Sequence, residues 1–242
     1  MGISGIKRFA QWAYQHAGEP YLAPLLYIEQ RTQKGPVNER GVEYGYALNE
    51  LSKHRDIKHV LDVGSGDSSW PHLLSYCGYK VTAIDYMRLA WGDDYWHKRA
   101  PYNRHFRIKP EDITYPRHVP HNFDAITCIS TLEHIKQYEL ALQNMAWLLR
   151  MGGHLILTVP CTEKEYRADV YEHEIRKYIC QSFTLKHVES WDRYYFGHLE
   201  ERRFYAGWTG EYWNEGERIS PPIAATPADM NLGCFHFVKV KE

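Results

Sequence analysis

The sequence lacks any long apolar run. No stretch of its 242 residues approaches the roughly 20 apolar residues that a membrane-crossing helix needs, so the sequence predicts no membrane span. Residues 1–6 also lack the apolar segment of a secretory signal peptide, and they carry no Ser or Thr at position six, which myristoylation favours. We therefore expect a cytoplasmic protein.

Neither sign of charge dominates, and cysteine is scarce. The 29 Lys and Arg residues against 30 Asp and Glu residues give a net charge of -1. The charges are scattered, so the chain offers no basic surface for a nucleic acid. The five cysteines show no paired metal spacing, and their odd number suits reduced thiols in the cytosol. We therefore expect no DNA or RNA partner.

The most informative segment is the run VLDVGSGDSS over residues 60–69. It predicts a buried strand that breaks into a glycine turn and then enters a helix. Gly64 and Gly66 carry no Cβ, so the backbone can turn tightly and approach a ligand closely. Serines that follow can cap the helix, whose N-terminus favours a carboxylate or phosphate. The segment predicts a site for a cofactor with a nucleoside and a polar tail.

A second short strand is expected over residues 80–84, and Asp85 ends it. Asp85 follows Asp62 by a strand, a helix and a strand, which is the spacing at which an acidic residue meets a ribose diol. NAD enzymes share this feature. Their phosphate turn, however, requires G-x-G-x-x-G, and the frame from Gly64 reads G-S-G-D-S-S. An NAD-dependent dehydrogenase is therefore the weaker alternative.

Later segments continue the pattern. Residues 123–135, FDAITCISTLEHI, indicate an apolar strand that runs out into Leu-Glu-His. Residues 138–149 have helical spacing, and Gly152 and Gly153 stop that helix before a strand over 154–160. The other expected elements are a helix over 39–51 and strands over 106–113, 183–188 and 234–241.

Taken in this order, the segments resemble class I S-adenosylmethionine (SAM) methyltransferases. Asp-x-Gly-x-Gly at 62–66 is similar to the first motif of the family, with Ser68 where a third small residue usually stands. The resemblance covers about residues 38 to 190 and the last strand. It implies an α/β, Rossmann-like fold: a seven-stranded, mostly parallel sheet with helices on both faces and an antiparallel last strand.

The resemblance also implies one methyltransferase domain over residues 1–242. Residues 1–37 would form an N-terminal helical cap over the cofactor site. Residues 191–233 are too long for a hairpin and indicate an aromatic-rich insertion before the last strand. Its rings and charges are consistent either with a small satellite core or with a lid over the acceptor.

The implied cofactor contacts lie at the strand ends. Asp85 would hold the ribose hydroxyls, and Tyr86 would pack on the adenine. Asp112 would meet the adenine amino group, with Glu111 as the neighbouring alternative. The full implied set is Asp62, Gly64, Ser65, Gly66, Ser68, Asp85, Tyr86, Glu111, Asp112, Ile113 and Ser130.

His134 is the expected catalytic residue. It follows the fourth strand, and an imidazole with an ordinary pKa of about 6.5 is suited to taking a proton from an acceptor hydroxyl. In similar small-molecule and sugar O-methyltransferases a histidine at this exit is the general base, although in other relatives it only packs. His187 or a tyrosine of the insertion is the next alternative. The implied substrate contacts are Glu133, Trp208, Tyr212 and Trp213.

The leading functional hypothesis is O-methylation of a hydroxyl on a small molecule, with a saccharide favoured because the insertion combines flat rings with hydrogen-bonding side chains. The alternatives are N- or C-methylation of a metabolite, and a SAM-binding protein that transfers nothing. No metal site is predicted, because His118 and His121 lack a third ligand nearby in the sequence. The oligomeric state is left open.

Overall fold

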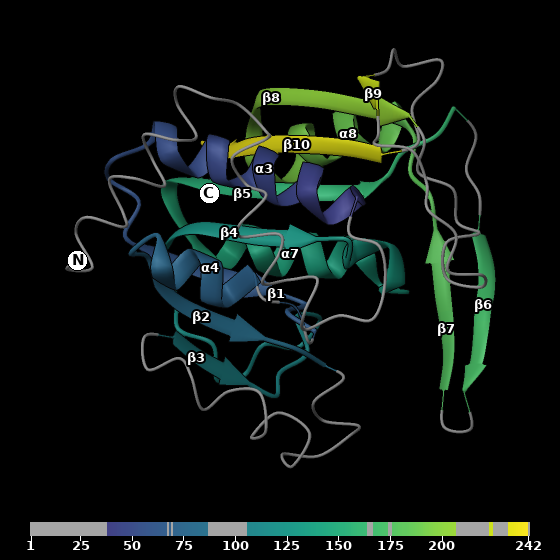
Figure 1. Ribbon diagram of the computed structural model, residues 1–242, viewed down its shortest axis with the longest axis horizontal. Coiled ribbons are helices and arrows are strands. Elements are labelled where there is room, and N and C mark those ends of the chain that lie inside the picture. The colour runs from purple at the N-terminus through teal and green to yellow at the C-terminus, as the bar shows by residue number, and fades with distance from the viewer. Residues whose placement is uncertain are drawn as a thin grey trace.

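A computed structural model gives the fold (Figure 1). It describes residues 38–66, 68, 70–86, 106–163, 167–173, 176–206, 223–224 and 232–241. The helical cap expected over residues 1–37 lies outside these residues, as does segment 207–222. Within the described residues, none of the helices has the length and apolar character to cross a membrane.

An eight-stranded sheet forms the centre, in the order β3-β2-β1-β4-β5-β10-β8-β9. Strands β3, β2, β1, β4 and β5 are parallel neighbours, and β10 runs antiparallel between β5 and β8. This arrangement confirms the Rossmann-like sheet with an antiparallel last strand, to which the short β9 adds an eighth strand. The strands are β1 (His59–Val63), β2 (Lys80–Ile84), β3 (Phe106–Lys109), β4 (Phe123–Ile129), β5 (Leu149–Pro160), β8 (Gly197–Ala206), β9 (Ile223–Ala224) and β10 (Leu232–Lys239).

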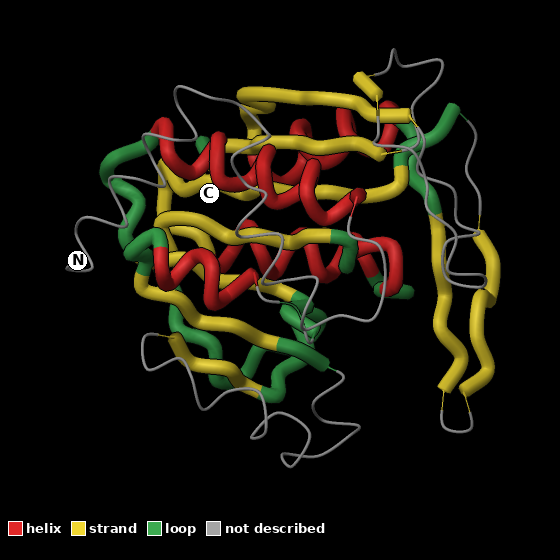
Figure 2. The backbone as a smooth tube through the Cα atoms, in the orientation of Figure 1, coloured by secondary structure: helices red, strands yellow, loops and turns green. Residues whose placement is uncertain are grey.

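Helices cover both faces of this sheet (Figure 2). One face carries α3 (Asn38–Lys53) and α4 (Trp70–Tyr76), and the other carries α7 (Tyr138–Leu148) and α8 (Leu185–Trp191). A short 3-10 helix, η3 (Leu132–His134), follows β4, and a π-helical turn, η4 (Asp192–Phe196), continues α8.

Strand β1 shows why its sequence is a nearly continuous apolar run. Val60 packs into the cluster under α3 and α4, whereas Leu61 and Val63 pack into the cluster under α7 and α8. All three side chains are at most 2% exposed. A parallel strand that is covered on both faces needs apolar residues on both faces.

The sixth strand expected over 183–188 is wrong. Phe183 makes a single bridge with Cys161, and α8 begins at Leu185. Thr184 caps that helix, and its backbone N–H donates to His187 Nδ1 at 3.1 Å. This capping box begins a helix where the strand was expected. The sixth strand is β8, which lies within residues 191–233 and therefore shortens the expected insertion.

A hairpin that the sequence did not indicate follows β5. Strands β6 (Arg167–His173) and β7 (Arg176–Gln181) pair antiparallel in a sheet of their own. The hairpin stands beyond the carboxyl ends of the parallel strands (Figure 1). Gln181 Nε2 donates to the Ile135 carbonyl at 3.0 Å, which ties the base of the hairpin to the exit of β4.

Asp124, at the start of β4, organises the opposite end of the sheet. Its Oδ2 accepts the backbone N–H groups of Lys58 and His59 at 2.9 and 2.8 Å, and its Oδ1 accepts Arg150 Nε at 2.8 Å. Burial raises the pKa of Asp124, but the hydrogen bonds from these donors lower it by a larger amount. The pKa of Asp124 therefore lies below its ordinary value of 3.8. Arg150 also bonds the exposed Asp56 at 2.5 Å.

We predict that Asp124→Ala lowers the free energy of unfolding by about 2–4 kcal/mol, because charge-assisted hydrogen bonds are worth about 1.5–3 kcal/mol each. The matched Asp56→Ala removes the exposed partner of the same arginine and should cost less than about 1 kcal/mol. Urea unfolding at pH 7 measures both. Because the folded pKa is lowered, the Asp124 contribution is complete above the ordinary value and disappears as the pH falls through the folded pKa. Equal losses in the two variants would contradict this ranking.

Candidate cofactor and active site

The glycine turn joins β1 to the end of β2. Gly64 and Gly66 have φ values of 74° and 51°, in the left-handed region that favours glycine. The backbone N–H groups of Gly64 and Ser65 both donate to the Ile84 carbonyl, at 2.9 and 3.2 Å. The turn therefore closes over the carboxyl end of β2, immediately before Asp85.

Asp85 and the turn form one unit. The Gly66 N–H donates to Asp85 Oδ2 at 2.6 Å, and Asp85 is only 4% exposed. A carboxylate can accept about four hydrogen bonds, so this contact is compatible with binding a ribose diol. Tyr86, the next residue, is 45% exposed, so its ring is available to a ligand. These residues fit the nucleoside half of SAM.

The two glycines differ in what surrounds them. A Cβ on Gly64 would lie 2.1 Å from Thr131 Cγ2, because the exit of β4 presses against the turn. The Thr131 hydroxyl is also shared between the Ile129 carbonyl at 3.0 Å and the Gly64 carbonyl at 3.3 Å. At Gly66 the nearest atom to an added Cβ, among the residues that the structure describes, is the Gly64 carbonyl oxygen at 4.0 Å. Gly66 therefore leaves space in which a ligand can approach the backbone.

Asp62 lies beneath the turn and is 2% exposed. Thr127 Oγ1 donates to Asp62 Oδ1 at 2.9 Å, and Trp70 Nε1 donates to Thr127 Oγ1 at 3.0 Å. The carboxylate therefore connects β1 to β4 and α4. A direct contact between Asp62 and the cofactor stays a prediction, as do the cofactor contacts of Ser65, which is 3% exposed, and of Ser68, whose Oγ accepts the Trp70 N–H at 3.4 Å.

The loop after β3 is held by its own acidic residues. His118 Nδ1 donates to Glu111 Oε1 at 2.7 Å. Asp112 Oδ1 accepts the backbone N–H and hydroxyl of Thr114 at 2.8 and 2.7 Å, and the Ile113 side chain belongs to the core. Asp112 is half-buried, whereas Glu111 is buried, so contact with the adenine stays assigned to Asp112 as a prediction.

Sequence reasoning missed Glu43, a fully buried carboxylate on α3. Ser130 Oγ and Thr158 Oγ1 both donate to Glu43 Oε1, at 2.5 and 2.7 Å. Ser130, at the end of β4, has a φ of 43° and is held by this contact. The available signal was the spacing of Glu43, Ala47 and Glu50, which places two carboxylates on the apolar face of the helix.

His134 ends η3, only three residues after the threonine that touches the glycine turn. Its backbone N–H donates to the Thr131 carbonyl at 3.0 Å, and its side chain is 37% exposed. Glu133 is buried, with Oε1 4.0 Å from His134 Nε2, which is an electrostatic distance rather than a hydrogen bond. Trp208, Tyr212 and Trp213 lie outside the described residues.

The other histidines considered from the sequence, His187, His118 and His121, contact neighbouring residues of the fold. His187 belongs to the cap of α8. His118 bonds Glu111, and the His121 ring lies edge-on to Trp147 with centroids 3.6 Å apart. Neither His118 nor His121 belongs to a group with metal-ligand spacing among the residues that the structure describes.

The strand order, the glycine turn after β1 and the carboxylate after β2 define the fold and cofactor site of class I SAM-dependent methyltransferases. The methyltransferase-domain family matches residues 37–202. The chain belongs to this family, whose cofactor is SAM.

Relatives are similar over part of the chain. A ubiquinone biosynthesis O-methyltransferase of Coxiella burnetii is 29% identical over 114 residues, which is 47% of each chain. The enzyme of the same name from Dechloromonas aromatica is 29% identical over 106 residues, 42% of this chain and 44% of that one. The match thus spans about half the length of these relatives.

Solved structures share the fold over most of the chain. The 1,6-didemethyltoxoflavin-N1-methyltransferase of Burkholderia thailandensis, with S-adenosylhomocysteine (SAH) bound, has a TM-score of 0.58 at 16% identity, covering 83% of this chain and 77% of that one. The N-methyltransferase NodS of Bradyrhizobium japonicum, also with SAH, has a TM-score of 0.56 at 19% identity, covering 87% and 91%.

We predict that Gly64→Ala destabilises the protein by about 3 kcal/mol or more, because strain at a left-handed position of about 1–3 kcal/mol adds to the overlap with Thr131. Gly66→Ala has the strain without the overlap and should cost about 1 kcal/mol. Thermal unfolding without ligand compares the two. Similar shifts in Tm would mean that the Thr131 contact does not restrict position 64.

We predict that Asp85→Ala weakens SAH binding at least tenfold, since each hydrogen bond lost from a charged acceptor is worth about 1.5–3 kcal/mol. Tyr86→Ala should weaken binding less, because it removes stacking area from an exposed ring. Isothermal calorimetry with SAH measures both affinities. Unchanged SAH affinity in Asp85→Ala would mean that this carboxylate does not contact the cofactor.

Proposed function

We propose that the protein transfers the methyl group of SAM to a hydroxyl group of a saccharide or another small molecule. The observation that carries this proposal is the position of His134 at the β4 exit, three residues after the threonine that contacts the glycine turn. Family membership and the geometry at Asp85 support the cofactor. The O-methyltransferase names of the partial relatives support oxygen as the acceptor atom.

Bound SAM supplies a methyl group that its sulfonium makes electrophilic. The chain then has to hold the nucleoside, align the acceptor and take a proton from it. The Gly64–Gly66 turn and Asp85 serve the first task. Alignment is the main catalytic contribution in an in-line transfer, and it depends on how rigidly the strand ends are held. Glu43 contributes here as a positioning residue, because it fixes Ser130 and Thr158.

His134 is suited to the proton transfer. Its backbone is hydrogen-bonded to Thr131, and Thr131 contacts Gly64, so the backbone that carries the imidazole is linked to the cofactor turn. Its half-exposed ring can accept the acceptor's hydroxyl proton and pass it to solvent. The Glu133 carboxylate, 4.0 Å from Nε2, favours the imidazolium that forms. Glu133 is buried, so this supporting role suits it better than the substrate contact.

The saccharide preference rests on residues 208–214, which combine Trp208, Tyr212 and Trp213 with Asn214. Sugar rings stack their C–H faces on flat aromatic rings and need polar side chains for their hydroxyls. The β6–β7 hairpin is tied to Ile135, just after the β4 exit, through the hydrogen bond from Gln181.

A phenolic hydroxyl is the second candidate acceptor, because the partial relatives carry the name of ubiquinone biosynthesis O-methyltransferases. A methyl-donor assay on saccharides, polyols, phenols and amines separates these classes. Transfer to amines alone would place the protein with N-methyltransferases. SAH binding without turnover on any class would favour a SAM-binding protein that transfers nothing.

We predict that His134→Ala lowers turnover roughly 10²–10⁴-fold with the best acceptor of that panel, which is the usual contribution of a general base. SAH affinity should stay within twofold of native, since the substitution leaves the turn and Asp85 in place. His121→Ala, which removes another exposed imidazole, is the matched control and should keep native turnover. Near-native turnover in His134→Ala would mean that another group accepts the proton.

A further inference from the structure

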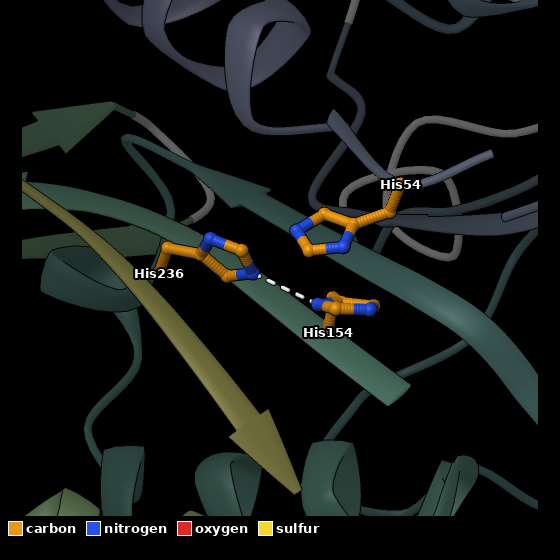
Figure 3. Close-up of side chains that lie close together, drawn as sticks. All are labelled: His54, His154 and His236. Carbon is orange, nitrogen blue, oxygen red and sulfur yellow. Dashed lines mark hydrogen bonds between the residues drawn. The ribbon is translucent and has the colours of Figure 1, made fainter. Parts of the chain in front are cut away.

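Three imidazoles from distant parts of the sequence converge under the C-terminal end of α3 (Figure 3). His54 directly follows α3, His154 lies in β5, and His236 lies in β10. The ring centroids are 4.0 Å apart for His54 and His154, and 5.1 Å apart for His154 and His236. One ring nitrogen of each histidine lies within 4.8 Å of those of the other two.

This histidine cluster is separate from the cofactor site. His154 pairs with Ala125 near the start of β4, whereas the glycine turn and His134 follow the ends of β1 and β4. His236 is fully buried and His154 is 5% exposed. His54 is partly exposed, so the cluster has one side towards solvent.

A buried carboxylate orients the deepest imidazole. His236 Nδ1 donates to Glu50 Oε2 at 3.1 Å. Glu50 is itself fully buried and is held by Lys53 Nζ, at 2.7 and 2.8 Å from its two oxygens. With Nδ1 committed to Glu50, the Nε2 atom of His236 faces His154 Nδ1 at 2.9 Å. A carboxylate behind an imidazole is the arrangement that orients histidine ligands in metal sites.

We propose that His54, His154 and His236 bind a divalent transition metal of the zinc class, with Glu50 as the carboxylate that orients His236. Three imidazole nitrogens suit zinc and its neighbours in the first transition row. The fourth position, on the solvent side at His54, is left for water, as in open three-histidine sites.

The geometry needs small adjustments. Zinc–nitrogen bonds of about 2.0–2.1 Å in a tetrahedral site place the ligand nitrogens about 3.3 Å apart. The His154–His236 pair, now 2.9 Å apart, has to open by about 0.4 Å, and His54 has to turn inward from a separation of up to 4.8 Å. His54 lies just beyond the helix, so its ring can turn without unwinding α3. The proton shared by the pair leaves Nδ1 of His154 and returns on its Nε2, so the ligand stays neutral.

The charges around the cluster are compatible with a bound cation. Burial, His54 and His236 lower the pKa of His154 to about 4, and burial and His236 lower that of His54. Both rings are therefore neutral at pH 7, which is the form that binds metal. Asp56, Glu200 and Glu50 act on His54 in the opposite direction, as nearby negative charges do. Lys53 and Arg150 are the opposing cations.

The test uses the full chain without a histidine tag, stripped with EDTA. Zn²⁺ is titrated by calorimetry, and Co²⁺ serves as a spectroscopic probe, because tetrahedral cobalt has strong visible absorption. We expect one equivalent to bind, and saturating Zn²⁺ to raise the Tm by about 5–10 °C, because the metal joins α3 to two strands. His54→Gln should weaken binding at least tenfold, and Glu50→Gln about 10–100-fold.

His59→Gln is the matched control. His59 is also partly buried near the same end of the sheet, where its ring packs against Phe123, and it lies outside the cluster. This variant should bind Zn²⁺ and Co²⁺ like the native chain. The Tm of each variant in EDTA shows whether it folds, and because His54 is only partly buried, His54→Gln should melt near the native temperature.

Two results would overturn the site. One is a native chain that binds neither metal more tightly than about 100 μM, because three imidazole ligands that need only small adjustments should bind Zn²⁺ more tightly than this. The other is a cobalt spectrum and affinity that are unchanged in folded His54→Gln, which would place the metal elsewhere in the chain. Neither result bears on methyl transfer, because the cluster lies away from the cofactor site.

Discussion

The parallel strands at the centre of the molecule are buried on both faces, and this constraint decides where chemistry can occur. Apolar side chains of β1 and β4 fill the space under both helix layers. A polar group in such a layer is costly unless it is hydrogen-bonded. The Thr127 hydroxyl meets that condition for Asp62 Oδ1, to which it donates, and for the Trp70 indole N–H, from which it accepts. The groups proposed to meet the cofactor therefore lie at the ends of these parallel strands.

Helix α3 connects the two ends of the sheet. Glu43 and Glu50 are seven residues apart, or about 10 Å along the helix axis, and both are fully buried. Glu43 bonds Ser130 and Thr158 at the carboxyl ends of β4 and β5, whereas Glu50 bonds His236 of β10 and its own neighbour Lys53. Two such anchors determine both the position of the helix along the sheet and its rotation about its own axis.

Sequence patterns predicted the elements whose structure is determined by residues that are close together in the chain. The run from Val60 to Gly66 specified a strand and a turn, because its apolar residues and glycines have no other simple arrangement. The strand expected over 183–188 is wrong, because Thr184 and His187 form a capping box that begins a helix at Leu185. Glu43 could not be placed from sequence, since its partners Ser130 and Thr158 are 87 and 115 residues away. The histidine cluster was missed for the same reason, as only the fold joins its three segments.

Contact between Gly64 and Thr131 also restricts the order in which this site can change over evolution. Both positions share one small space, so a side chain at 64 overlaps the threonine methyl group. A smaller residue at 131 would remove that overlap, although the left-handed backbone at 64 would remain unfavourable for most residues. Substitution at 131 must therefore come first, and the two positions should vary together among descendants of this sequence rather than independently.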